Sequence, residues 1–256
     1  MVGATRPAVK PFDTTADPTS VEASQYALVQ GMRSTRATLA TWRASPWPVL
    51  GSWLRGAVAA AGVLLVAVAI VALVSTASPG WVQLQPPFVV GGPGDVIRIL
   101  VANGLVLALH AMACVAGFIA GSSLPLQANR YTGRMRVIHE RGPAVAIGFV
   151  VCATAFSLSM QAYTIGRATA QDAASLHSSR LLLLLGVLPH ALPELVALFL
   201  PLAAWILASR RGEWERLLAA TAVTVSLAVP ILIAAATWEV YVAPHLLTAL
   251  LGTLSA

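Results

Sequence analysis

The sequence predicts an all-α membrane protein, a polytopic bundle of about five transmembrane helices with a cytoplasmic N-terminus. The chain of 256 residues is 57% hydrophobic and only 10% charged, whereas about a quarter of the residues in an average soluble domain are charged. Its apolar residues form long runs, and a spanning helix needs ~20 of them. Its basic residues cluster between these runs, as the positive-inside rule expects.

The predicted spans cover residues 56–77, 96–121, 143–165, 181–209 and 217–238. With their connecting loops they form one integral membrane domain, residues 55–256. Residues 181–209 contain two central prolines, so this segment forms either one kinked span or two half-helices, and both structures stay open. The C-terminal tail is too short for a sixth span, and a short re-entrant or interfacial helix is expected at residues 244–254.

Loop charges set the predicted orientation. Arginines gather at residues 130–141 and again at residues 210–216, so both segments are expected in the cytoplasm. The loop from Pro79 to Asp95 contains no Lys or Arg and is expected outside, as is the C-terminus. This pattern accounts for the net charge of +6 without a nucleic-acid partner. We expect a multi-pass protein of the cytoplasmic (inner) membrane.

The segment before the first span has a different character. Residues 1–18 are rich in Pro, Thr, Ala and Asp and are expected to form a disordered tail. Residues 19–54 are predicted as an amphipathic helix and linker, with an apolar stripe at Val21, Leu28, Met32, Leu39 and Trp42. The helix either lies in the membrane surface or packs on the inner face of the bundle, and both arrangements stay open. No cleavable signal peptide is expected.

The candidate functional site lies in the span at residues 181–209. His190 and Glu194 are four residues apart and share one helix face, and each directly follows a helix-breaking proline, Pro189 or Pro193. Ionisable residues at such depth are costly and often functional. The pair either relays protons or binds a metal, or it is a structural pair that fixes helix packing; the structural interpretation is favoured.

Three further polar residues lie in or directly after other spans: Asn103, His110 and Glu239. Together with His190 and Glu194 they either line one polar cavity or form separate interhelical hydrogen bonds. Such bonds are common in membranes and contribute ~0.6 kcal/mol on average. We favour hydrogen bonds for Asn103 and His110, and both interpretations stay open for Glu239.

Motifs of enzymes are not found in the chain. It contains no GxSxG, P-loop or dinucleotide fingerprint. The spacing at His190 and Glu194 differs from HExxH, and two ligands fall short of the three expected for a metal site. Cys114 and Cys152 lie singly in apolar runs, so no disulfide framework is expected. We therefore expect no enzyme, no catalytic residue, no metal and no cofactor.

Two segments carry more specific motifs: GVLPHALPELVALFLPLAAWILA (186–208) and IAAATWEVYVAPHLL (233–247). They resemble the stage II sporulation protein M (SpoIIM) family of integral membrane proteins. The residues that match the family's motifs are Pro189, His190, Glu194, Glu239, Tyr241 and Pro244, with Asn103, Gly117 and Gly121 on an Asn-led helix. Ala191 departs from the pattern, because many relatives have Gly after the His.

The resemblance implies a non-enzymatic scaffold or permease-like subunit of a cell-envelope complex. In endospore formers the family member scaffolds two peptidoglycan-degrading partners, but relatives also occur in organisms that make no spores, so the resemblance leaves open whether sporulation is involved. The expected partners are the lipid bilayer, other membrane or envelope proteins such as wall hydrolases or an ATPase subunit, and further copies of the chain. Two alternatives stay open: the membrane subunit of a type 2 ABC exporter, and an intramembrane metal-dependent enzyme.

Overall fold

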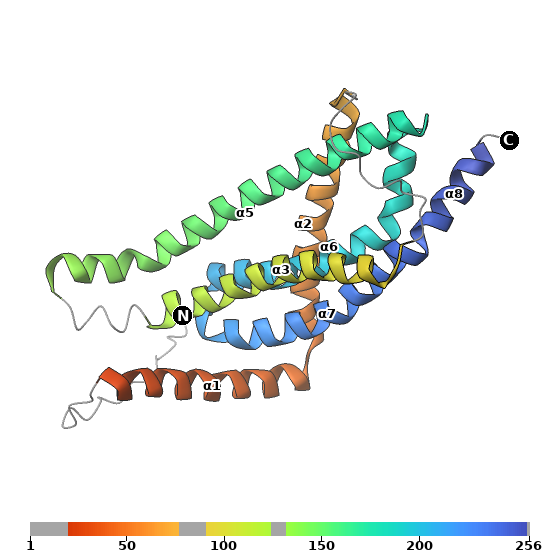
Figure 1. The fold of residues 1–256 in the computed structure, drawn as a ribbon. Helices are drawn as coiled ribbons and strands as arrows, with labels where there is room; N and C mark the ends of the chain where they lie inside the picture. Colours follow the sequence, from red (N-terminus) through yellow and green to blue (C-terminus); the bar gives the residue numbers. More distant parts are fainter. Residues whose placement is uncertain (1–19, 77–90, 124–131, 255–256) are drawn as a thin grey trace, which may run out of the picture.

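The structure of the protein is a computed structural model that describes residues 20–76, 91–123 and 132–254; the predicted tail at residues 1–18 lies outside this part. The described residues form helices joined by short connections (Figure 1). In chain order these are α1 (Ser20–Ala44), α2 (Trp47–Val74), α3 (Pro93–Phe118), the π-helix η1 (Ile119–Ser123), α5 (Gly133–Ser175), α6 (Arg180–Arg211), the 3₁₀ helix η2 (Trp214–Arg216), α7 (Leu217–Tyr241) and α8 (Ala243–Leu254). Five helical segments within the described residues are long and apolar enough to span a membrane. The predicted all-α fold with five membrane-spanning helices is confirmed.

The largest difference from the predicted boundaries concerns α5. The span was expected at residues 143–165 between arginine-containing loops, but the helix runs unbroken from Gly133 to Ser175. Arg134, Arg167 and Asp172 are therefore helical residues. Arginine is a good helix former, so a helix extends past the apolar run without a local penalty. The first span also starts earlier than expected, at Trp47, where Pro48 in the first turn suits the start of a helix.

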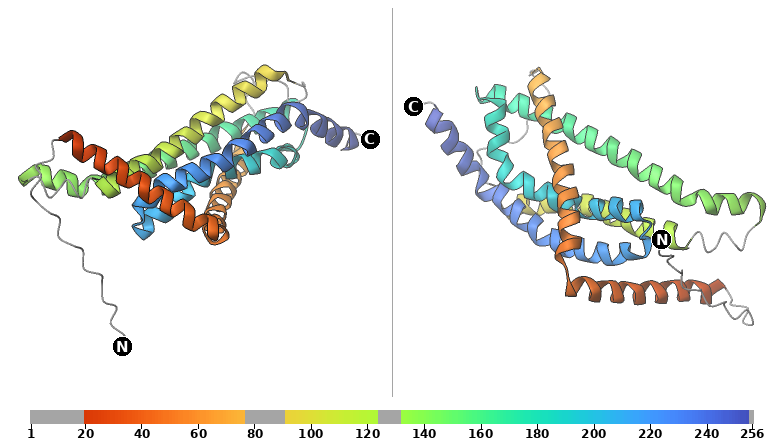
Figure 2. Two further views of the ribbon diagram at one scale, coloured as in Figure 1. Left: turned by 90° about the horizontal axis from the view of Figure 1, so that it is seen from below. Right: turned by 180° about the vertical axis from the view of Figure 1, so that it is seen from behind.

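Helix α6 is one continuous helix and not two half-helices. It contains three internal prolines, Pro189, Pro193 and Pro201. Each proline removes a backbone donor and crowds the preceding turn, which bends a helix. Figures 1 and 2 show the result: the first part of α6 runs in a different direction from the rest. The bend brings Gly186 onto Leu247 of α8, at a point where a Cβ on residue 186 would collide with the leucine.

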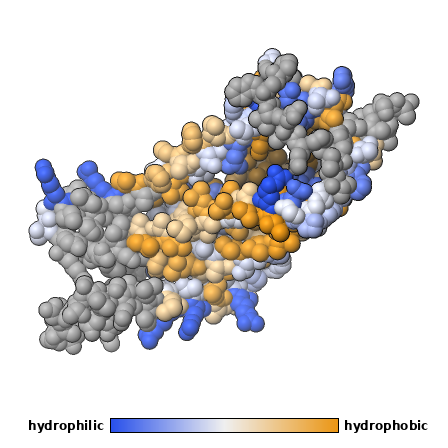
Figure 3. Space-filling view, viewed as in Figure 1, coloured by the Kyte–Doolittle hydropathy of each residue, from blue (hydrophilic) through white to orange (hydrophobic). Residues whose placement is uncertain are grey.

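The core lies where α2 crosses α6. The buried residues of α2 recur every three or four positions, at Trp53, Ala57, Ala61, Leu64, Val68 and Ala72. Small residues let the two backbones approach closely; a Cβ on Gly56 would lie 3.1 Å from the Cβ of Ala203. Hydrophobic residues cover much of the visible surface, and hydrophilic groups project along much of its outline, with one further group inside it (Figure 3). This distribution agrees with a chain that spans a membrane.

Arg180, the first residue of α6, caps the end of α2. Its Nη1 donates hydrogen bonds to the carbonyl oxygens of Ala72 and Leu73, at 2.9 and 2.7 Å. The last carbonyls of a helix lack intrahelical partners and carry the negative end of the helix dipole. The arginine therefore satisfies two carbonyls and ties the start of α6 to the end of α2.

Candidate functional site

The candidate site is built on one face of α3 that packs against α6 and α7. The residues of this face recur at intervals of three or four: Asn103, Leu107, His110, Cys114, Gly117 and Gly121. Leu107, His110, Cys114 and Gly117 are all buried. Successive positions along α3 contact successive positions along α6, so the two helices run parallel, as expected for spans separated by one further crossing.

Near the start of this face, Asn103 meets Glu194. The side-chain Nδ2 of Asn103 donates a hydrogen bond of 2.9 Å to Oε1 of Glu194. Both residues are half-buried, and in a bilayer such a pair avoids the cost of an unsatisfied polar group. The hydrogen bond predicted for Asn103 is thus present, and its partner is Glu194.

Further along, His110 and Cys114 contact the backbone of α6. The Nδ1 of His110 lies 2.8 Å from the carbonyl oxygen of Leu198, and because a carbonyl only accepts, Nδ1 is the donor. The thiol of Cys114 donates to the carbonyl oxygen of Pro201 at 3.2 Å. These contacts flank the turn in which Pro201 supplies no N–H to the helix. The hydrogen bond predicted for His110 is therefore present as well, while the role of Cys114 was not predicted.

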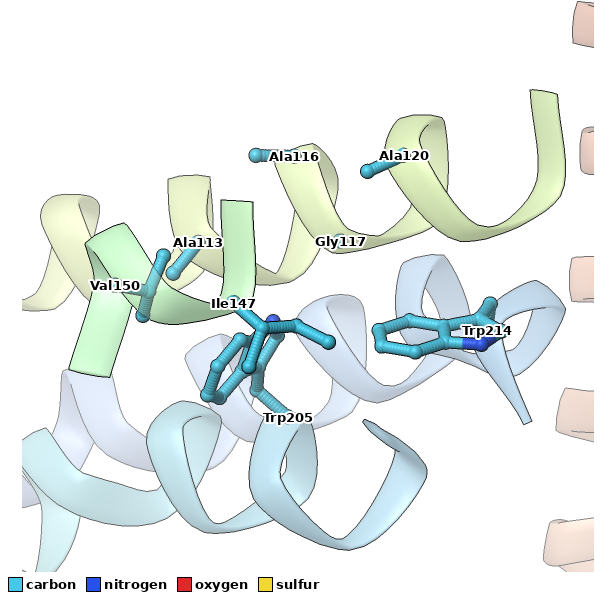
Figure 4. Close-up of a pocket in the computed structure, with 8 residues that line it drawn as sticks. All are labelled: Ala113, Ala116, Gly117, Ala120, Ile147, Val150, Trp205 and Trp214. Carbon is cyan, nitrogen blue, oxygen red and sulfur yellow. The ribbon is translucent and has the colours of Figure 1, made fainter. Parts of the chain in front are cut away.

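At the far end of the face, glycines accommodate two tryptophans. A Cβ on Gly117 would lie 2.7 Å from Nε1 of Trp205, and a Cβ on Gly121 would collide with the indole of Trp214. Figure 4 shows Trp205 and Trp214 below α3, with Ile147 and Val150 of α5 beside them. The cavity left between these side chains is about 10 Å³. The two indoles therefore pack closely against this end of α3.

A groove lies between α6 and α7, and we call it the His190 groove. It is about 340 Å³ and is lined by Pro189, His190, Pro193, Pro230, Ile231, Ala234, Ala235 and Trp238. The three prolines and Trp238 are exposed, whereas His190 is buried, with 6% of its surface exposed. Nδ1 of His190 is buried and has no hydrogen-bond partner among the described residues.

The predicted pairing of His190 with Glu194 is wrong. The two residues share a face of α6, but no hydrogen bond or ion pair joins them in the described part of the chain. The bend of α6 turns Glu194 toward Asn103 of α3, while His190 lines the groove toward α7. Side-chain spacing within one helix could not reveal this, because the competing partner comes from another span.

The remaining predicted residues lie near the junction of α7 and α8. Glu239 is half-buried and lies close enough to Glu194 and Arg98 to interact with both electrostatically. Tyr241 is the last residue of α7, and Pro244 lies in the first turn of α8. Pro244 accepts a hydrogen bond from Thr248, four residues later. Within the described residues, no three His, Cys, Asp or Glu side chains gather in a way that could hold a metal ion.

The five apolar spans, joined by polar contacts within them, define a multi-pass α-helical membrane protein. Residues 142–244 match the family model described as SpoIIM, Stage II sporulation protein M. The match covers most of α5, all of α6 and all of α7, and it confirms the resemblance to the SpoIIM family. No curated protein and no solved structure matches the chain.

Proposed function

We propose that the protein is a non-enzymatic scaffold of a cell-envelope complex in the cytoplasmic membrane, and that it holds the membrane segment of a partner protein in the His190 groove. The observation that carries this proposal is the buried, unpartnered Nδ1 of His190, a residue in the lining of an otherwise apolar groove. Buried polar groups without a partner are rare in folded proteins. A buried polar group of this kind at membrane depth needs a hydrogen-bond partner, and the described chain does not supply one.

The chemistry of the groove favours a helix over a lipid tail. A hydrocarbon chain fills apolar space but offers imidazole no hydrogen bond. A transmembrane helix with a Ser, Thr, Asn or Gln side chain supplies both an apolar surface and a hydrogen-bonding group. Such residues are frequent at helix contacts in membranes. Pro193 also has no N–H, so the carbonyl of Pro189 lacks its usual intrahelical donor. Two groups of the groove-lining residues, the Nδ1 of His190 and the carbonyl of Pro189, therefore lack a partner in the described part of the chain, within an apolar surface.

The rest of the site supports a fixed frame more than a transport pathway. Asn103, His110 and Cys114 are engaged in contacts between α3 and α6. Trp205 and Trp214 pack against Gly117 and Gly121 at the other end of this face of α3. A frame of this kind suits a scaffold, which is the role that the SpoIIM resemblance implies. Wall hydrolases are the class of partner to test first.

A second candidate is the membrane subunit of a type 2 ABC exporter. The observation that favours it is α1, a helix that precedes the spans and packs on α7 and η2. Such permeases have a comparable amphipathic helix and bind a nucleotide-binding subunit. The two candidates differ in the partner that they require.

Purification of the native complex tests the proposal. The full-length protein is tagged, cross-linked in intact cells, extracted in mild detergent, and its partners are identified and quantified. We expect a membrane-anchored envelope protein to copurify with the unsubstituted chain. The His190→Leu variant should lose this partner but keep the thermostability of the unsubstituted chain. His245→Leu is the matched control, because His245 is exposed on α8 outside the groove. A stoichiometric nucleotide-binding subunit, stoichiometric metal, or a partner retained by His190→Leu would contradict the proposal.

A further inference from the structure

A second surface with a recognisable chemistry lies on α1, away from the His190 groove. Figure 2 (left) shows α1 crossing α7 instead of running along it, near the end of the molecule where α2 begins. One face of α1 is fixed to the bundle: a Cβ on Gly31 would lie 3.0 Å from Phe118, and Trp42 packs edge-on against Trp53 with ring centroids 5.1 Å apart. The helix therefore lies across one end of the spans, where a membrane surface would be.

Beside this fixed face runs a stripe of alternating apolar and basic residues. Met32, Arg36, Leu39 and Arg43 follow one another at helical intervals of four, three and four residues and so share one side of α1. Met32 is 54% exposed, Leu39 is half-buried, and both arginines are exposed. Figure 3 shows hydrophilic side chains projecting along the edge formed by α1.

The charges of this stripe are not neutralised within the described part of the chain. Neither Arg36 nor Arg43 forms a salt bridge with a described acidic residue. Arg33 adds a third exposed cation one turn before Arg36. Just after α1, the indole of Trp47 is 80% exposed, and exposed tryptophan next to arginine is typical of the membrane interface.

We propose that this stripe, Met32–Arg36–Leu39–Arg43, binds the phosphate groups of anionic phospholipids. A guanidinium group donates two parallel hydrogen bonds to phosphate. The apolar side chains between the arginines enter the boundary with the acyl chains, as in interfacial helices. A nucleic acid or an acidic protein would use the arginines alone and leave Met32 and Trp47 without a contact. The proposal is independent of the His190 groove and of the partner held there.

The test follows the position of α1 in nanodiscs, which leave both membrane faces accessible. The full-length chain carries Cys152→Ser, to remove an exposed thiol, and Ala40→Cys, labelled with an environment-sensitive fluorophore on an exposed position of α1. Nanodiscs contain phosphatidylcholine alone or a mixture with phosphatidylglycerol. Quenching by acrylamide, which is neutral and so not repelled by the lipid, reports exposure of the label. We expect weaker quenching with phosphatidylglycerol, and a smaller difference at high salt because anionic surface attraction is screened.

Three variants assign the effect to the stripe. Arg36→Gln with Arg43→Gln should weaken the association of α1 with the phosphatidylglycerol surface by roughly fivefold for each arginine, and so reduce the protection of the label at each phosphatidylglycerol fraction. Arg36→Lys with Arg43→Lys keeps the charge and should retain most of the response. Arg134→Gln with Arg141→Gln removes the same charge from exposed positions of α5 and should change nothing at the label. Equal quenching in both lipids, or an unchanged response in the Arg36/Arg43 glutamine variant, would overturn the proposal.

Discussion

Asn103 of α3 donates a 2.9 Å hydrogen bond to Glu194 of α6, a residue 91 positions later in the chain. The bond joins two parallel spans at the end of a shared face that continues through His110 and Cys114. It also leaves His190, four residues before Glu194, free to face α7. The arrangement of the whole site thus depends on which of two polar residues in α6 turns toward α3.

The Asn103–Glu194 contact predicts a measurable coupling. Asn103→Leu and Glu194→Leu each leave one polar partner unpaired, and the double change removes both. We expect a coupling free energy of ~0.6 kcal/mol, with ~1.7 kcal/mol as the upper limit seen for such bonds. The measurement is a double-mutant cycle of detergent thermostability. The control cycle, His190→Leu with Glu194→Leu, should be additive; coupling in the control and none in the first cycle would restore the His190–Glu194 pair.

The sequence was sufficient to predict the helical fold and the membrane spans, because both follow from local hydropathy. Four predicted spans correspond to α2, α3, α6 and α7, with shifts at the ends. The extent of α5 was missed because Arg134, Arg167 and Asp172 resemble loop residues in a hydropathy pattern, although helices tolerate them outside the apolar core. Charge therefore marks where an apolar run ends, and it does not mark where a helix ends.

The contacts between spans were harder to predict. The polar residues Asn103, His110 and Glu194 were recognised from their depth, but their partners depend on the relative register of α3 and α6, which no single segment encodes. The one usable signal was the spacing of Asn103, His110, Cys114, Gly117 and Gly121, which share a helix face. The packing of Trp205 and Trp214 against that face could be seen only in the folded structure.

The glycines of α3 predict a position-specific effect on stability. Gly117→Ala places a Cβ 2.7 Å from Nε1 of Trp205, while Gly104→Ala meets nothing within 4 Å on the same helix. Overpacking costs about 1–3 kcal/mol, so Gly117→Ala should lower the detergent thermostability. Gly104→Ala should leave it unchanged or raise it slightly, because alanine is the better helix former. Equal loss in both variants would mean that Trp205 does not pack on Gly117.

The cap on α2 predicts a role for Arg180 in stability. Arg180→Gln loses the charged hydrogen bonds to the carbonyls of Ala72 and Leu73. Because the site is partly exposed, we expect a loss of about 1–2 kcal/mol in unfolding free energy. Arg211→Gln, at an exposed arginine in the last turn of α6, should change it by less than about 0.5 kcal/mol. Chemical denaturation in mixed micelles compares the two, and similar losses would show that the cap is unimportant.

The orientation of the chain is a separate prediction from loop charge. Arg134 and Arg211 should face the cytoplasm; Gln85 and Ala256, which lie outside the described residues, should face out. Cysteines introduced one at a time at these four positions, in a Cys152→Ser background that keeps the buried Cys114, are treated with an impermeant thiol reagent in intact cells. Positions 85 and 256 should label directly, and positions 134 and 211 only after permeabilisation. Labelling at 134 or 211, with protection at 85, would reverse the topology.

The central claim is that the His190 groove holds a membrane segment of a partner protein, and photo-cross-linking in native membranes tests it most directly. A photoreactive amino acid replaces Ala234, which lines the groove, and in a matched chain it replaces Ile233. Ile233 is the adjacent residue of α7, 49% exposed and outside the groove lining. We predict that position 234 forms a discrete cross-link to one membrane-anchored envelope protein, that His190→Leu abolishes it, and that position 233 forms none. Cross-links from position 234 to lipid alone, or equal cross-linking from both positions, would contradict the claim.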